Sequence, residues 1–157
     1  MKMSNPINMV KLVEELSKRP RGRACVVLTD DYFGQKTWGA ELAKQTGADH
    51  IDLLDLFAGD AGLAGRISSF LVSELFTFLQ GKSSSGVLIV TGLEFIKATW
   101  SGQPDAIDQF ATRLETWEGS PALLFVMQFD PVLAKRKFKR FQDKIFVINQ
   151  KDTLALS

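Results

Sequence analysis

The segment from Asp30 to Thr37 has the residue types and the spacing of a phosphate-binding loop. The pattern G-x-x-x-x-G-K-[ST] places a lysine on the outer phosphates and a hydroxyl on Mg²⁺, and Lys36-Thr37 supply this ending. Asp30 replaces the first glycine of the pattern and Gln35 replaces the second, while Gly34 stands one place early. The spacing therefore predicts a nucleotide-binding architecture, and it leaves open whether nucleotide is bound.

Candidate contacts for ATP or ADP come from the whole loop and the start of the helix expected after it. Thr37 is the candidate Mg²⁺ ligand if nucleotide binds. The carboxylates of Asp30 and Asp31 would repel a polyanion unless they point away or a cation intervenes. The alternative is a loop closed by its own side chains, with Lys36 paired to Asp30 or Asp31. The full set of candidates is Asp30, Asp31, Tyr32, Phe33, Gly34, Gln35, Lys36, Thr37 and Trp38.

Two further polar segments are expected near this loop, because ligands of parallel sheets bind beyond the carboxyl ends of the strands. Thr91 and Gly92 follow an apolar run and stand where a Walker B motif has its metal-linked acid and its water-orienting acid. Glu94 is either a displaced catalytic acid or a glutamate that stabilises a helix start. Gln128 ends the next apolar run, where it either senses a terminal phosphate or has a purely structural use.

The elements that must position these residues alternate along the chain. Apolar runs predict strands over 24–28, 50–57, 87–90, 122–128 and 144–149, with a small edge at 154–156. Amphipathic spacing predicts helices that begin at Pro6, at Thr37, at Ala61, at Pro104 and at Pro131. This order predicts an α/β fold whose mostly parallel sheet of about five strands carries helices on both faces. We expect one domain over 1–157, with an N-terminal helix and linker over 1–22 and a core over 23–157.

The helix expected over 61–80 is apolar nearly all round, so two sides of it need cover. The N-terminal helix is one candidate cover, and a subunit interface is the other.

Composition excludes several classes of protein. Cys25 and His50 are each the only residue of their type, which excludes a disulfide framework and a His-rich metal site. No apolar run approaches the roughly 20 residues of a membrane span, the N-terminus has no signal-peptide core, and the formal charge is only +1. A cytoplasmic protein is expected.

A basic cluster follows Asp130-Pro131. If a helix runs on to Phe141, Ala134, Phe138 and Phe141 face inward. The outward face can bind phosphates of DNA or RNA, can send an arginine finger into a neighbouring subunit, or can simply be solvated. Its members are Lys135, Arg136, Lys139 and Arg140.

These parts, in this order, resemble an AAA+-type P-loop NTPase core, a three-layer domain, here without the usual helical lid domain. The resemblance covers residues 23–149 and implies that Arg140, in the Arg140-Phe141 pair, is an arginine finger beside the candidate catalytic residues Glu94 and Gln128. The chain length and the Val-Thr-Gly-Leu-Glu run resemble the BrxF family, small P-loop proteins of type 3 BREX phage-defence systems. That likeness implies a bacterial cytoplasmic protein that works with other defence proteins. The leading interpretation is a degenerate P-loop assembly or regulatory subunit that binds ATP or ADP weakly if at all.

Two other functions stay open at this level. One is an active ATPase completed in trans by Arg140 within a homo-oligomer. The other is a DNA-binding accessory protein that uses the basic helix over 132–141. The missing glycines and the missing acids depart from the pattern of an active ATPase, so hydrolysis is expected to be very slow or absent.

Overall fold

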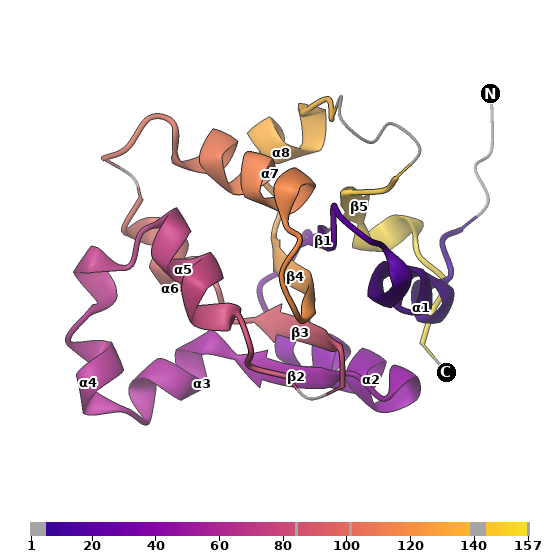
Figure 1. Cartoon of the computed structure of the whole chain (residues 1–157), viewed down its shortest axis with the longest axis horizontal. Helices are drawn as coiled ribbons and strands as arrows, with labels where there is room; N and C mark the ends of the chain where they lie inside the picture. The colour runs from indigo at the N-terminus through magenta and orange to yellow at the C-terminus, as the bar shows by residue number, and fades with distance from the viewer. Residues whose placement is uncertain (1–5, 84, 101, 139–143, 157) are drawn as a thin grey trace.

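The sheet is the centre of the fold. The computed structural model describes residues 6–83, 85–100, 102–138 and 144–156 (Figure 1). In these residues five strands form one sheet in the order β2-β3-β4-β1-β5, and every neighbouring pair is parallel. The predicted α/β fold with a parallel five-stranded sheet is therefore confirmed. The strands are β1 (Ala24–Thr29), β2 (Asp49–Asp52), β3 (Val87–Thr91), β4 (Ala122–Gln128) and β5 (Val147–Asn149).

Helices lie on both faces of this sheet. One face carries α1 (Met9–Lys18) and α2 (Gln35–Thr46), whose apolar side chains pack with Cys25 and Val27. The other face packs with Ala24, Val26 and Leu28. It carries α3 (Leu53–Ala58), α4 (Ala61–Ala64), the 3₁₀ turn Ile67–Ser69, α5 (Val72–Leu79), α6 (Glu94–Ala98), α7 (Ala106–Thr116) and α8 (Pro131–Lys135).

The direction of the crossovers explains which face each helix takes. The chain leaves β1 for the far edge at β2, and then returns through β3 and β4 before it passes β1 to reach β5. Crossovers between parallel strands are right-handed, so connections that run in opposite directions must lie on opposite faces. The connection that contains α2 accordingly lies on one face, and the connections from β2 onward lie on the other.

Strand interiors supply the core on both sides. β1 and β3 are buried along their whole length, which is typical of parallel strands covered on two faces. Cys25 packs inside β1, as expected, and burial raises the pKa of its thiol to about 12. That thiol therefore serves packing rather than nucleophilic chemistry.

The long helix expected over 61–80 is wrong. Asp60 caps the short helix α4, whose Gly62 and Gly65 favour an early end, and a 3₁₀ turn separates it from α5. The expected cover by the N-terminal helix is also wrong, because α1 lies on the opposite face of the sheet. Phe76 of α5 instead packs against Phe110, Trp117 and Phe125.

Other boundaries differ because capping chemistry decides them. The strand expected over 50–57 ends at Asp52, whose side chain caps α3. The first helix begins after Asn8, which caps it, rather than at Pro6. β5 is shorter than 144–149, and no strand forms over 154–156. There the chain is held next to the first helix, since Ile7 N donates to Asp152 O (2.9 Å) and Leu154 N donates to Ile7 O (2.8 Å).

Candidate functional site

The phosphate-loop segment joins β1 to α2, as predicted. β1 ends at Thr29, the loop turns through Gly34 at φ +89°, and α2 begins at Gln35. The left-handed conformation at Gly34 suits a residue without Cβ. The N-cap residue Gly34 makes no side-chain capping hydrogen bond. Because α2 follows the carboxyl end of β1, its first N–H groups and the positive end of its dipole lie at the carboxyl edge of the sheet. Lys36 stands in that first turn.

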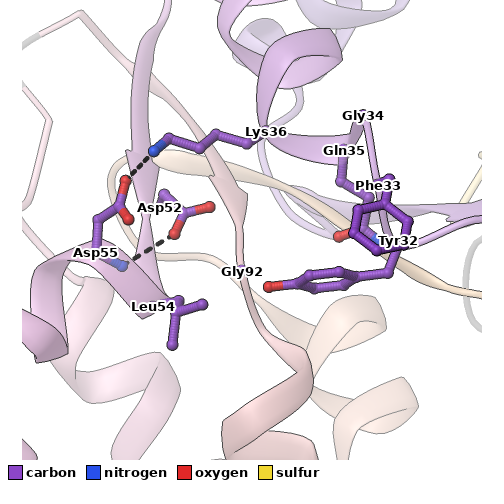
Figure 2. A pocket seen from close by; sticks show the side chains of 9 residues that line it. All are labelled: Tyr32, Phe33, Gly34, Gln35, Lys36, Asp52, Leu54, Asp55 and Gly92. Atoms are coloured by element: carbon purple, nitrogen blue, oxygen red, sulfur yellow. Dashed lines mark hydrogen bonds and ion pairs between the residues drawn. The ribbon is translucent and has the colours of Figure 1, made fainter.

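Lys36 forms an ion pair with Asp55, a residue of α3 (Figure 2). The hydrogen bond that the Lys36 ammonium donates to the Asp55 carboxylate raises the pKa of Lys36, and both side chains are exposed. The expected alternative of a pair with Asp30 or Asp31 is therefore wrong. Asp31 instead accepts a hydrogen bond from Phe33 N (2.7 Å), which shapes the loop locally.

Asp52 is a second carboxylate beside this ion pair (Figure 2). Thr91 Oγ1 donates to Asp52 Oδ2 at 2.9 Å and also lies 2.9 Å from His50 Nε2. The end of β3 is shaped around Asp52, because a Cβ added at Gly92 would lie 2.6 Å from Asp52 Oδ1. The carboxylate thus fills space beside the Walker B position, although it comes from the neighbouring strand β2.

Sequence reasoning missed Asp52 and Asp55 because the segment was interpreted as a continuous strand. A signal was present. Asp52 precedes Leu53 and stands three places before Asp55, which is the spacing of a helix N-cap with an acidic residue in the first turn. Asp52 Oδ1 indeed accepts from Asp55 N at 3.0 Å.

Glu94 and Gln128 meet beneath the loop rather than beside Lys36. Gln128 N donates to Glu94 Oε2 at 2.7 Å. Gln35 is buried, and with its amide turned so that donors face acceptors, its nitrogen donates to Glu94 Oε1 (3.2 Å) and its oxygen accepts from Thr29 Oγ1 (2.9 Å). Burial raises the pKa of the Glu94 carboxyl. The side chain that replaces the second loop glycine therefore ties the loop to the ends of β1 and β4.

Two pockets flank the N-terminus of α2. The first, which we name the Lys36 pocket, has a volume of about 190 Å³ and is lined by Tyr32, Phe33, Gly34, Gln35, Lys36, Asp52, Leu54, Asp55 and Gly92. The second, which we name the Trp38 pocket, has a volume of about 480 Å³ and is lined by Thr29, Asp31, Phe33, Gly34, Gln35, Thr37, Trp38, Glu41, Gln150, Ala155 and Leu156. Three residues, Phe33, Gly34 and Gln35, line both pockets. Asp30 is exposed and lines neither.

The basic segment is not one continuous helix as far as the structure describes it. α8 ends at Lys135, and Arg136 Nη1 donates to Asp108 Oδ1 of α7 at 2.7 Å. Leu133 is the buried residue of α8, whereas Ala134, expected to face inward, is exposed. Phe138 stacks on Phe146 with ring centroids 4.8 Å apart. Lys139, Arg140 and Phe141 lie outside the described residues, so the arginine-finger assignment stays a prediction.

Within the described ranges no group of three or more His, Cys, Asp or Glu side chains is arranged to hold a metal ion by itself. None of the helices in these ranges has both the length and the apolar character needed to cross a membrane.

The fold and the site define an α/β domain with a strand–loop–helix site at the carboxyl edge of a parallel sheet. Comparisons with protein-family models, with curated proteins and with solved structures give no match to this chain.

Proposed function

We propose that the chain is a degenerate P-loop domain that binds a magnesium nucleotide, ATP or ADP, and acts as an assembly or regulatory subunit. The uncapped N-terminus of α2, with Lys36 in its first turn, carries this proposal. It lies where the connection after β1 and the connection after the neighbouring β4 leave on opposite faces, which is where doubly wound sheets bind ligands. The strand order and the helices on both faces support a three-layer AAA+-type core.

Charge argues for a magnesium nucleotide over a free phosphate. A polyphosphate beside Asp52 and Asp55 would meet two carboxylates and one ammonium. A divalent cation between phosphate and carboxylate reverses this repulsion, and Mg²⁺ is commonly held by one or two carboxylates together with phosphate oxygens. Asp52, which Thr91 orients by a hydrogen bond, is the first candidate to bind this Mg²⁺ ion. Thr37, the ligand expected from the motif, lines the Trp38 pocket instead and is the second candidate.

Binding without efficient turnover follows from the residues at the end of β3. Phosphoryl transfer depends on positioning and on charge stabilisation. Gly92 has no side chain to orient water, and Glu94 is engaged by Gln35 and by the backbone of Gln128. A regulatory role in phage defence, with other defence proteins as partners and with self-association, rests on the resemblance of the sequence to the BrxF family.

The proposal is tested by calorimetric titration of the chain with ATP and Mg²⁺. Lys36→Ala removes the point charge that reaches the outer phosphates, and we expect it to weaken binding at least about tenfold. Lys44→Ala, at the far end of the same helix, should bind as the unchanged chain does. Equal affinity in the unchanged chain and in Lys36→Ala would reject the site.

The same samples test the regulatory role. We expect phosphate release near background, and sedimentation that shifts toward larger species when ATP and Mg²⁺ are added. Robust phosphate release would instead support the ATPase alternative. Binding without any change in self-association would leave the nucleotide site standing and would reject nucleotide-driven assembly.

A further inference from the structure

We infer that the Trp38 pocket is the base-binding half of the nucleotide site and that it takes a purine. This inference rests on the proposed function, since it assigns the base of the nucleotide whose phosphates lie at the α2 N-terminus. It is carried by a different part of the molecule, namely the side of α2 that faces the C-terminal segment.

The position of the pocket is the first observation. It shares the lining residues Phe33, Gly34 and Gln35 with the Lys36 pocket, so the two pockets are neighbours at the helix N-terminus. A nucleotide is elongated, with its phosphates at one end and its base at the other. With the phosphates near Lys36, a base reaching over Gly34 enters the Trp38 pocket.

The size of the two pockets separates their roles. The Trp38 pocket, at about 480 Å³, lies within the range of about 300 to 1,000 Å³ that small-molecule sites occupy. The Lys36 pocket, at about 190 Å³, is too small for a whole nucleoside and suits phosphates. A site made of both pockets holds a complete nucleotide, whereas the Lys36 pocket alone would hold only its phosphate end.

The chemistry of the walls fits a flat aromatic ring. Trp38 contributes an indole ring to the lining, and Ala155 and Leu156 of the C-terminal segment contribute apolar side chains. Aromatic rings stack favourably on such surfaces. Glu41, one turn beyond Trp38, adds a carboxylate that can accept from the exocyclic amino group of adenine or guanine, and Gln45 Nε2 donates to Glu41 Oε2 at 2.9 Å and so orients it.

The C-terminal segment that lines the Trp38 pocket is fixed by backbone hydrogen bonds within the chain. The backbone of Ile7 pairs with Asp152 and Leu154 on either side of an isolated parallel bridge to Thr153. Leu156 packs against the core cluster that contains α1 and α2. A wall that is already in place costs little ordering entropy when the base binds.

The test compares ATP with inorganic tripolyphosphate, both with Mg²⁺, by calorimetric titration. Stacking of a base on an aromatic side chain corresponds to about 5- to 150-fold in affinity, so ATP should bind the unchanged chain tighter than tripolyphosphate by a factor in that range. Trp38→Ala should lose this advantage while it keeps the affinity for tripolyphosphate. Trp38→Phe, which retains an aromatic face, should keep most of the preference for ATP.

Each other outcome is decisive. Equal affinities of ATP and tripolyphosphate in the unchanged chain would overturn the base assignment and leave the phosphate site intact. A Trp38→Ala variant that still prefers ATP would overturn it as well. If the unchanged chain binds neither compound, the proposed function fails together with this inference.

Discussion

Lys36 already has an anionic partner, so a phosphate must compete with Asp55 for it. The neighbouring Asp52 differs from Asp55 in its contacts, because Thr91 Oγ1 orients it against Gly92. The two carboxylates are therefore expected to affect nucleotide binding in opposite ways. Asp55 should compete with the ligand, whereas Asp52 should assist its binding through a metal ion.

The corresponding substitutions are Asp55→Asn and Asp52→Asn. Asp55→Asn should strengthen binding of ATP in EDTA by about two- to fivefold, since it removes an exposed competing charge. Asp52→Asn should remove most of the gain that Mg²⁺ gives, while asparagine still caps α3. Titrations in Mg²⁺ and in EDTA measure both effects. If Asp52→Asn keeps the full magnesium effect, the metal is held elsewhere, with Thr37 as the next candidate.

The contact between α2 and β3 depends on a glycine. An added Cβ at Gly39 would lie 2.7 Å from Thr91 Cγ2, on the strand that orients Asp52. Gly39→Ala in an open helix would stabilise the fold by about 1 kcal/mol. Here we expect it to lower the free energy of unfolding by about 1 to 3 kcal/mol, because overpacking forces the helix from the sheet.

Urea unfolding measures this effect, and a double variant provides the control. Gly39→Ala combined with Thr91→Ser removes the obstructing methyl group but keeps the hydroxyl that contacts Asp52 and His50. The double variant should recover most of the stability lost in Gly39→Ala. A stabilised single variant would contradict the close contact of α2 with β3.

The elements that the sequence predicted well are those that a local pattern determines. β1, β3 and β4 are continuous apolar runs between turn residues, and α2 follows the loop glycine. The break within 61–80 and the end of β2 were missed because single capping residues, Asp60 and Asp52, outweigh a favourable apolar pattern. Hydrophobic periodicity does not register such caps.

The sequence predicted which residues belong to the site, but not which of them lie next to one another in the fold. The motif identified Lys36 and Thr37, and the strand ends identified Glu94 and Gln128. Which of them meet depends on the order of the strands, and an unaligned sequence does not reveal that β2 lies beside β3. The partnership of Lys36 with Asp55, and the filling of the space at Gly92 by Asp52, therefore emerged only from the fold.

The stability of the whole molecule should depend on pH through two groups of opposite sign. Desolvation lowers the pKa of His50 from its ordinary 6.5. Below pH 6.5 the unfolded chain therefore binds a proton that the folded chain resists, so stability rises as pH increases through this window. Burial raises the pKa of Glu94 from 4.5. In that case the folded chain binds the proton more tightly, so stability falls as pH increases from 4.5 through the raised value.

Urea unfolding between pH 4.5 and 8 separates the two groups. The stability of the unchanged chain relative to His50→Gln should increase with pH and level off above about pH 7.5. Its stability relative to Glu94→Gln should decrease with pH. Because His50 is the only histidine of the chain, no other imidazole contributes. Parallel curves for the unchanged chain and His50→Gln would show that His50 is not desolvated in solution.

β2 forms one edge of the sheet, next to β3. An edge strand presents unpaired backbone groups to solvent, and these can recruit a strand from another chain and start aggregation. β2 is only four residues long and carries a carboxylate at each end, Asp49 and Asp52. Short edge strands with charged side chains resist such pairing. Asp52 is therefore expected to hinder such pairing at the edge of the sheet, and it also lines the Lys36 pocket, where we propose that nucleotide binds. A replacement that removes its charge should affect both aggregation and nucleotide binding.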